Sequence, residues 1–169
     1  MPRLWIPSLA VALAAAAALT VLVAVPPASA DTGQRTDRAG DAPGIIDITR
    51  VTVRNDRSRV VITSHVPGLK TRGGFAWGYS TSPNGGLLVF ADKIAGRLVV
   101  EATYCGEITC HDVTCRGLRV RWMTAKHRLS AIIPQRCYPA PLPSPGVFTA
   151  TSASKDDYDY AGVLRVPRG

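Results

Sequence analysis

The chain contains the sequence GLRVRWM-TAKH-RLSAII at residues 117–133. Apolar and charged side chains alternate before the short polar TAKH turn, and an apolar-rich run follows it. This pattern is typical of an antiparallel β-hairpin with one buried face. A four-residue turn places Val120 opposite Ala131 and Trp122 opposite Leu129, which pairs apolar with apolar. A three-residue turn shifts the pairing by one residue.

The hairpin also bears on the pairing of the four cysteines. Either register brings Cys115 within one residue of Cys137, and cross-strand Cα atoms about 4.5–5.5 Å apart lie within disulfide range. The same pairing leaves Cys105 and Cys110 opposite positions that hold no cysteine. We therefore predict Cys115–Cys137 and, by elimination, Cys105–Cys110. A zinc site that uses His111 is the alternative, but its C-x4-C-x4-C spacing differs from that of structural zinc sites.

Short β-type runs with turn residues between them continue on both sides of the hairpin. Residues 46–54 and 59–66 form a second hairpin, in which we expect Val53 to face Val60 and Val51 to face Ile62, with a bulge near Thr49. No convincing amphipathic helix is present. We predict an antiparallel two-sheet β-sandwich of about eight to nine strands. The further expected strands are residues 74–80, 86–92, 96–104, 146–153 and 161–166.

The N-terminus has the pattern of an export signal. Arg3 precedes the apolar run Leu9–Val25, two prolines follow, and Ala28-Ser29-Ala30 is a small-x-small cleavage site. We predict a signal peptide over residues 1–30, cleavage after Ala30, and a secreted or extracellular product. The alternative is an uncleaved membrane anchor. The predicted product has a flexible lead-in at 31–44 and a single β-sandwich domain at 45–169.

The charge of the predicted product is positive. The chain carries 20 Lys and Arg against 12 Asp and Glu, a net charge of +8, and removal of residues 1–30 removes only Arg3 and leaves +7 on 139 residues. A basic surface outside the membrane attracts anionic cell-wall polymers, other glycans or phospholipid headgroups. The alternative is a soluble protein whose basic residues are scattered and bind no particular partner. The arginines never form a run of five, so no basic tail is present and we expect no nucleic-acid partner. We expect a monomer and no cofactor.

Several motifs resemble those of a known family. Asp37-x-x-Gly40-Asp41 leads into Asp47-Ile48 and a Val-rich hairpin, Ile133–Cys137 ends a later strand, and Asp157–Asp159 precedes the last strand. This arrangement resembles a family of small secreted β-sandwich proteins of GC-rich Gram-positive bacteria that has no established activity. It is more distantly similar to sandwich modules that bind carbohydrate. The chain has Tyr138-Pro139 where the family pattern continues with Leu-Gly, and the Cys105–Cys110 pair looks like an addition.

Three alternating aromatic residues are the candidate ligand-binding site. Phe75, Trp77 and Tyr79 share one face of a predicted strand because side chains alternate along a strand. If that face is exposed, the rings form a platform for stacking on sugars. If it is buried, the rings belong to the core of the sandwich, since large aromatic side chains dominate cores.

The acidic residues near both ends are candidate calcium ligands. Calcium prefers carboxylate and carbonyl oxygens as ligands. Four aspartates in these acidic segments are the candidates: Asp41, Asp47, Asp157 and Asp159. No complete calcium-binding loop is present. The alternative is that these residues occupy solvated turns, where exposed Asp is common.

The sequence provides little support for catalysis. It has three histidines (His65, His111 and His127) and no Gly-x-Ser-x-Gly motif, which argues against a triad hydrolase. The expected function is therefore a non-enzymatic extracellular binding domain. Two alternatives are a secreted hydrolase that uses carboxylates brought together by the fold, and a protease inhibitor that presents the Pro139–Pro145 segment.

Overall fold

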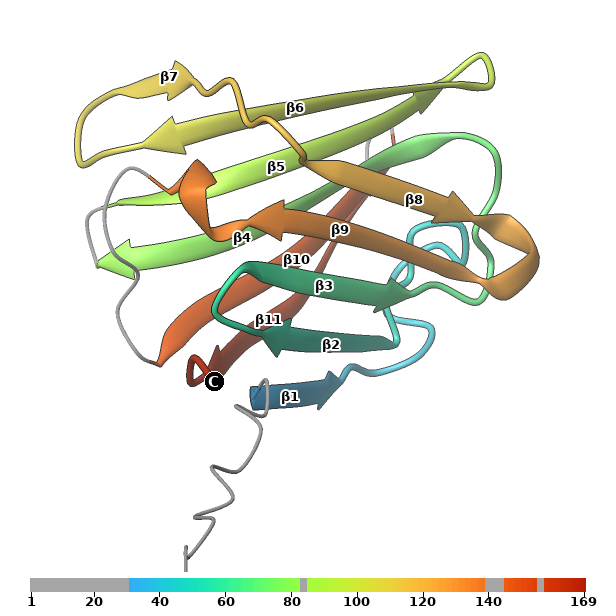
Figure 1. The fold of residues 1–169 in the computed structure, drawn as a ribbon. Coiled ribbons are helices and arrows are strands. Elements are labelled where there is room, and N and C mark those ends of the chain that lie inside the picture. Colours follow the sequence, from blue (N-terminus) through green and yellow to red (C-terminus); the bar gives the residue numbers. More distant parts are fainter. Residues whose placement is uncertain (1–30, 83–84, 139–144, 155–156) are drawn as a thin grey trace, which may run out of the picture.

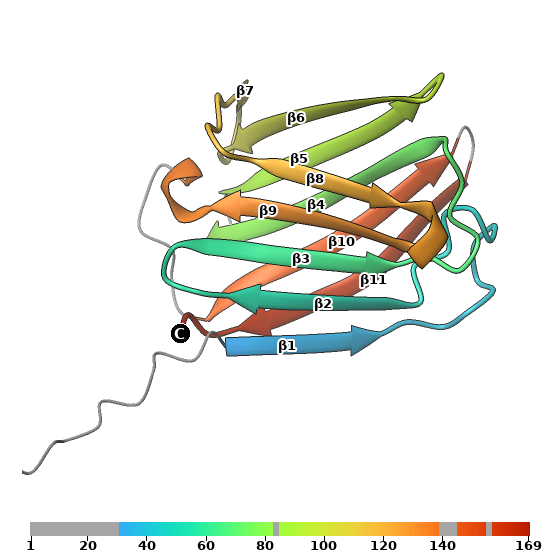
Figure 2. The ribbon, with the colours of Figure 1, turned by 45° about the vertical axis from the view of Figure 1, so that its right-hand side comes forward.

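The computed structural model describes residues 31–82, 85–138, 145–154 and 157–169. Two antiparallel sheets face each other and form a β-sandwich, as Figures 1 and 2 show. The five-stranded sheet has the order β1 (Asp31–Thr36), β2 (Arg50–Asn55), β3 (Arg59–His65), β9 (Arg128–Pro134), β8 (Arg119–Met123). The six-stranded sheet has the order β11 (Asp157–Val166), β10 (Gly146–Ser154), β4 (Gly73–Ser82), β5 (Gly85–Ile94), β6 (Arg97–Cys105), β7 (Cys110–Asp112).

The predicted fold class is confirmed, with two more strands than the sequence indicates. The described residues form eleven strands and two short 3-10 helices, η1 (Thr124–Lys126) and η2 (Gln135–Cys137). Within those residues there is no helix long and apolar enough to cross a membrane. The additional strands are β1 and the three-residue β7, whose sequences are polar. Both lie at sheet edges, where a strand can pair without burying an apolar face.

The prediction of a flexible lead-in over residues 31–44 is wrong for its first part. Asp31–Thr36 pair in register with β2, from Asp31 opposite Asn55 to Thr36 opposite Arg50. Residues 45–49 also differ from the prediction, since β2 begins only at Arg50 and no bulge near Thr49 is needed. Ile46 and Ile48 are fully buried but belong to a loop. Their even-numbered positions therefore need not continue the alternation of β2, in which the odd-numbered Val51 and Val53 face the core.

The β8–β9 hairpin has the predicted register of a four-residue turn. Val120 lies opposite Ala131 and Trp122 opposite Leu129. The Trp122 side chain packs edge-on against Phe75 of the opposite sheet, with ring centroids 5.2 Å apart. The hairpin therefore brings its apolar face to the interior, as the alternation of the sequence requires.

The predicted register of the β2–β3 hairpin is wrong by two residues. Val53 faces Ile62 and Asn55 faces Val60, so β2 continues through Asn55 before the chain turns. Because the shift is even, the same side chains still face the core. Asn55 is fully buried and stays in the strand because its side chain is hydrogen-bonded: Nδ2 donates to the Val166 carbonyl at 3.2 Å, and Oδ1 accepts from Gln135 Nε2 at 3.0 Å.

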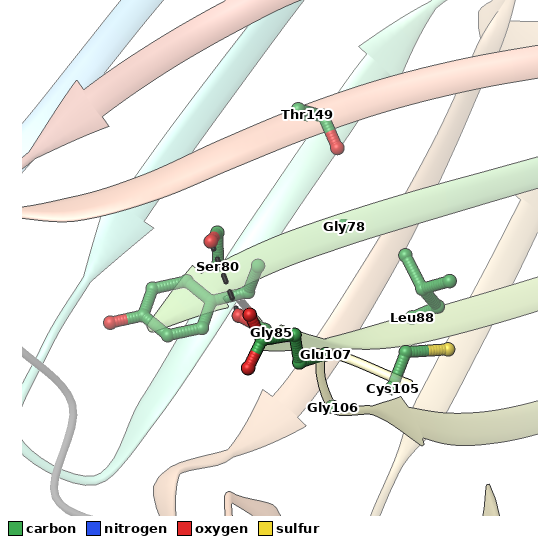
Figure 3. Close-up of a pocket in the computed structure, with 10 residues that line it drawn as sticks. Gly78, Ser80, Gly85, Leu88, Cys105, Gly106, Glu107 and Thr149 are labelled. Carbon is green, nitrogen blue, oxygen red and sulfur yellow. Dashed lines mark hydrogen bonds between the residues drawn. The ribbon is translucent and has the colours of Figure 1, made fainter. Parts of the chain in front are cut away.

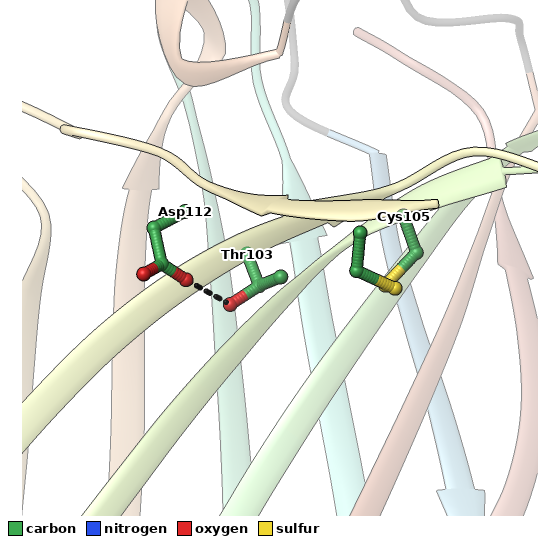
Figure 4. Close-up of a disulfide and its surroundings, with 4 residues drawn as sticks. Thr103, Cys105 and Asp112 are labelled. Atoms are coloured by element: carbon green, nitrogen blue, oxygen red, sulfur yellow. Dashed lines mark hydrogen bonds between the residues drawn. A yellow bond between two sulfur atoms is a disulfide. The ribbon is translucent and has the colours of Figure 1, made fainter. Parts of the chain in front are cut away.

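Both predicted disulfides are present. Cys115–Cys137 joins the segment before β8 to the helix η2 after β9, and Cys137 is buried. Cys105–Cys110 joins directly opposed residues of β6 and β7 at a Cα–Cα distance of 4.0 Å. Figure 4 shows this second bridge beside the hydrogen bond from Thr103 Oγ1 to Asp112 Oδ1, which also links β6 to β7. One disulfide and one side-chain hydrogen bond thus hold β7, a strand of only three residues, against β6.

The two disulfides are expected to stabilise the protein unequally. Removing Cys115–Cys137 with the double substitution Cys115→Ser and Cys137→Ser releases a loop of sequence separation 22 and should cost about 3 kcal/mol of unfolding free energy. Removing Cys105–Cys110 in the same way releases a loop of separation 5 and should cost about 2 kcal/mol. Urea denaturation of both double variants measures the difference. Equal losses, or a larger loss for the shorter loop, would contradict this ranking.

Asn55 is expected to be a polar link between the sheets. Asn55→Ala leaves the Val166 carbonyl of β11 without its side-chain donor and should lower the unfolding free energy by about 2 kcal/mol. Gln34→Ala is the matched control, because Gln34 is an exposed amide on β1 and should change stability by less than about 0.5 kcal/mol. If both variants have the stability of the parent, Asn55 does not contribute as its hydrogen bonds indicate.

Candidate functional site

The aromatic side chains predicted to bind a ligand lie in the core. Phe75, Trp77 and Tyr79 of β4 are 3%, 1% and 1% exposed. Trp77 Nε1 donates to Ser64 Oγ of β3 at 3.0 Å, across the interface between the sheets. The interpretation of this stripe as a platform for sugars is therefore wrong, because no face of these rings is available to a ligand. The alternative, a core position, is correct.

The outer face of β4 carries small residues and forms a shallow depression. It has a volume of about 370 Å³ and lies around Gly78, Ser80 and Gly86. Figure 3 shows Leu88 and Thr149 on the two sides of Gly78, where a Cβ atom would meet the side chains of both. Because Gly78 has no side chain, the side chains of Leu88 and Thr149 can occupy the space beside its Cα atom. The glycine at position 78 is therefore explained by packing.

The outer face of the five-stranded sheet is strongly basic. Its strands alternate buried apolar residues with exposed arginines, so arginines far apart in sequence point to the same side. The members of this basic face are Arg50, Arg54, Arg59, Arg119, Arg121 and Arg128, all exposed. The alternation of Arg50 with Val51 and of Arg119 with Val120 is visible in the sequence. What the sequence could not show is that the strands carrying these arginines lie in one sheet.

The registers of the strands arrange this basic face in rows. One row crosses the sheet through Arg128, His65 and Arg50, which are paired on neighbouring strands. The next row holds Arg121, Ser130, Thr63 and Thr52, so hydroxyl groups occupy its centre. The row after it has Arg119 at one side and Arg54 toward the other. Hydroxyl groups thus lie beside Arg121 in one row, whereas the apolar side chains of Val61 and Ile132 lie between Arg54 and Arg119 in the next.

The ionisation of neighbouring groups reflects this charge. Burial is the main cause that lowers the pKa of His65, and the positive charges of Arg50, His127 and Arg128 lower it further. Both effects favour the uncharged form of the ring. Asp56 lies at the edge of the face and forms ion pairs with Arg54 and Arg59 at 3.5 and 3.4 Å. Burial would raise its pKa, but hydrogen bonds from Ser58 and Arg59 outweigh burial and lower it.

Three carboxylates meet at the opposite edge of the sandwich, where β1 and β11 are neighbours. Asp37 and Asp41 lie in the turn after β1, and Asp159 lies in β11, with Asp37 partly exposed, Asp41 exposed and Asp159 buried. One carboxylate oxygen of each lies within 4.8 Å of those of the other two. We call these three residues the aspartate cluster. The Asp159 Oδ2 also accepts a hydrogen bond from the Ile48 amide at 2.6 Å.

The structure brings together two of the four predicted calcium ligands and adds one. Asp41 and Asp159 are in the aspartate cluster, and Asp37, which was not among the predicted ligands, joins them. Asp47 adjoins the cluster, because its Oδ2 accepts from the Gly40 amide at 2.9 Å. Asp157 is exposed and pairs with Ser154 at the start of β11, apart from the cluster. Burial raises the pKa of Asp159; the backbone amides of Ile48 and Tyr160 oppose this rise, and the nearby charges of Asp37 and Asp41 add to it.

The histidines do not form a catalytic arrangement within the described residues. His65 Nδ1 is hydrogen-bonded to Thr49 Oγ1 at 3.1 Å, and no described carboxylate orients the other side of this ring. His111 is exposed on β7 and packs against the Tyr104 ring, with centroids 5.7 Å apart. His127 is exposed in the turn between β8 and β9. Of the proposed inhibitory segment Pro139–Pro145, residues 139–144 lie outside the described residues, as does the predicted signal peptide.

Comparison with known proteins yields no further assignment. A scan against protein-family models found no match, and a search of the curated proteins found none.

The position of Trp77 in the core can be tested by mutation. Trp77→Ala should lower the unfolding free energy by about 3–5 kcal/mol, because it leaves a large cavity. Tyr158→Ala is the control, since Tyr158 is 64% exposed on β11 and its loss should cost less than about 0.5 kcal/mol. Chemical denaturation followed by circular dichroism measures both. A Trp77→Ala variant as stable as the parent would show that this ring is not in the core.

Proposed function

We propose that this protein is a secreted, non-enzymatic domain that binds an anionic cell-wall polymer on the basic face of its five-stranded sheet. The observation that carries the proposal is the presence of six exposed arginines on one side of one sheet. Arginine pairs with phosphate and carboxylate groups through two parallel hydrogen bonds. A surface that presents several guanidinium groups suits a polymer with repeated negative charges.

The dimensions of the basic face fit an extended ligand. Strands lie about 4.8 Å apart and residues two positions apart along a strand lie about 7 Å apart. The face therefore offers positive charges at intervals of roughly 7–13 Å over four of its five strands. Between them, the hydroxyls of Thr52 and Thr63 can hydrogen-bond to sugar or polyol groups. A chain of charged and hydroxylated units would contact both kinds of side chain.

The opposite face has a different charge. The six-stranded sheet exposes the carboxylates of Asp92 and Glu101 on its outer side, and Glu107 lies exposed in the loop at its edge. This asymmetry directs an anionic polymer toward the five-stranded sheet, since charged ligands are steered by the field of the whole molecule. The two disulfides support an extracellular location, because such bonds persist in oxidising compartments.

Removing charge from the basic face should weaken binding. The double substitution Arg119→Gln and Arg121→Gln removes two exposed arginines of β8 and should reduce affinity for poly(glycerol phosphate) roughly three- to tenfold, with a weaker dependence on salt. Arg97→Gln with Arg165→Gln is the matched control, because it removes the same charge from the outer side of the six-stranded sheet. Isothermal titration at several salt concentrations measures both.

The choice of probes separates the sources of negative charge. Polygalacturonate tests a carboxylate glycan, dextran a neutral glycan, and vesicles of phosphatidylglycerol a lipid surface. The proposal expects binding to the anionic polymers and none to dextran. Equal losses in the two double variants would mean that net charge alone matters and would contradict a site on the basic face. Preference for the vesicles over both polymers would contradict the polymer as ligand.

A further inference from the structure

The aspartate cluster concentrates negative charge without a positive partner. Two of its carboxylates come from the turn after β1 and the third comes from β11, and one oxygen of each lies within 4.8 Å of those of the other two. No described lysine, arginine or histidine forms an ion pair with any of them. Arg38 follows Asp37 directly, but it is the backbone amide of Arg38 that donates to Asp37 Oδ1, at 3.0 Å. Like charges at this separation repel one another, although the chain as a whole is positively charged.

A fourth carboxylate supplies an independent observation. Asp47 is 6% exposed, and its Oδ1 is buried without a hydrogen-bond partner. Its Oδ2 is bonded to the amide of Gly40, which lies in the turn between Asp37 and Asp41. The next residue, Ile48, donates its amide to Asp159. The Asp47 carboxylate is thus bonded to the turn that carries Asp37 and Asp41, and the residue after it is bonded to Asp159.

Unpartnered buried oxygens require a physical explanation. Asp37 Oδ2 shares this property with Asp47 Oδ1, since both atoms are buried and have no hydrogen-bond partner. Buried polar atoms in folded proteins are satisfied by hydrogen bonds, water or ions. Two such carboxylate oxygens next to a group of like charges indicate a cation as the missing partner.

We propose that Asp37, Asp41 and Asp159 bind one Ca²⁺ ion, with Asp47 as an adjoining carboxylate. The donors are all oxygens, which a hard cation prefers, and Ca²⁺ takes such ligands at about 2.3–2.6 Å. Two ligands of one Ca²⁺ ion can therefore lie up to about 5 Å apart, which accommodates the separations in the cluster.

A cation at this position would connect the two sheets. Asp37 and Asp41 belong to the turn that follows β1 of the five-stranded sheet, and Asp159 belongs to β11 of the six-stranded sheet. Figure 2 shows the segment between β1 and β2 at the end of the sandwich where β11 begins. Elsewhere on this edge, hydrogen bonds from Arg35 Nη1 to the Val163 carbonyl and from Asn55 Nδ2 to the Val166 carbonyl, both at 3.2 Å, also link the sheets. The ion would thus hold the N-terminal strand against the C-terminal one.

Calcium titration of the purified protein tests this inference. Isothermal titration with CaCl₂ should show one site with a Kd of about 0.1–1 mM, the range of extracellular modules. Saturating CaCl₂ should raise the Tm by about 5 °C over the same protein in EDTA and KCl of equal ionic strength. Asp41→Asn removes one ligand at an exposed position, so the fold should be retained. Asp157→Asn is the matched control, because it removes an exposed aspartate of β11 outside the cluster.

The stability expected for the variants relative to the parent differs between EDTA and CaCl₂. In EDTA, Asp41→Asn should be at least as stable as the parent, because the repulsion within the cluster is reduced. In CaCl₂ the parent and Asp157→Asn should gain stability, whereas Asp41→Asn should gain little. No heat of binding and no shift of the parent Tm would overturn the proposal. An equal shift for Asp41→Asn and the parent would also overturn it, since it would indicate unspecific screening of charge.

Discussion

The structure depends on the row of aromatic side chains that β4 places between the two sheets. Trp77 is the centre of this row, and its indole nitrogen donates to Ser64 of the opposite sheet at 3.0 Å. On one side of it Phe75 meets Trp122 of β8, and on the other Tyr79 packs against Phe148 of β10, with centroids 4.6 Å apart. A polar bond at the centre of an apolar interface fixes how the sheets are aligned, since a shift would leave the buried hydroxyl without its donor.

This use of the aromatic residues decides where the protein can interact with other molecules. Alternation along a strand means that whatever faces inward cannot face outward. Because β4 directs its three large rings inward, its outer side is left with glycine, alanine and serine, and the six-stranded sheet has no continuous aromatic surface over β4. In the five-stranded sheet valine, isoleucine and leucine fill the inner side, and arginine takes the outer positions. The burial of the core and the charge of the surface are thus two results of one pattern.

The sequence predicted those features that depend on neighbouring strands with clear alternation. The β8–β9 register followed from the apolar pairs of one hairpin, and both disulfides followed from the same hairpin because either of its registers brings Cys115 close to Cys137. The β2–β3 register did not, since Asn55 looks like a turn residue. Only its partners Val166 and Gln135, which are distant in sequence, hold it in the strand. β1 was missed for a similar reason: its residues are polar, and its pairing with β2 is decided by the sheet edge.

The same limit applies to the charged sites. Asp41 and Asp159 were recognisable as candidate ligands by residue type, but their partner Asp37 is identified only by the contact between the first and last strands. The loop that carries the aspartates leads directly into β2, which begins with Arg50 of the basic face. Any group that fixes this loop also fixes the start of β2. The position of Arg50 and the row it forms with His65 and Arg128 is therefore coupled to the aspartate cluster through only a few residues of backbone. The proposed cation site and the proposed polymer-binding surface can coexist in so small a domain because Asp37 and Asp41 of the loop lie close to Asp159 of β11, while β2 directs its arginines to the outer side.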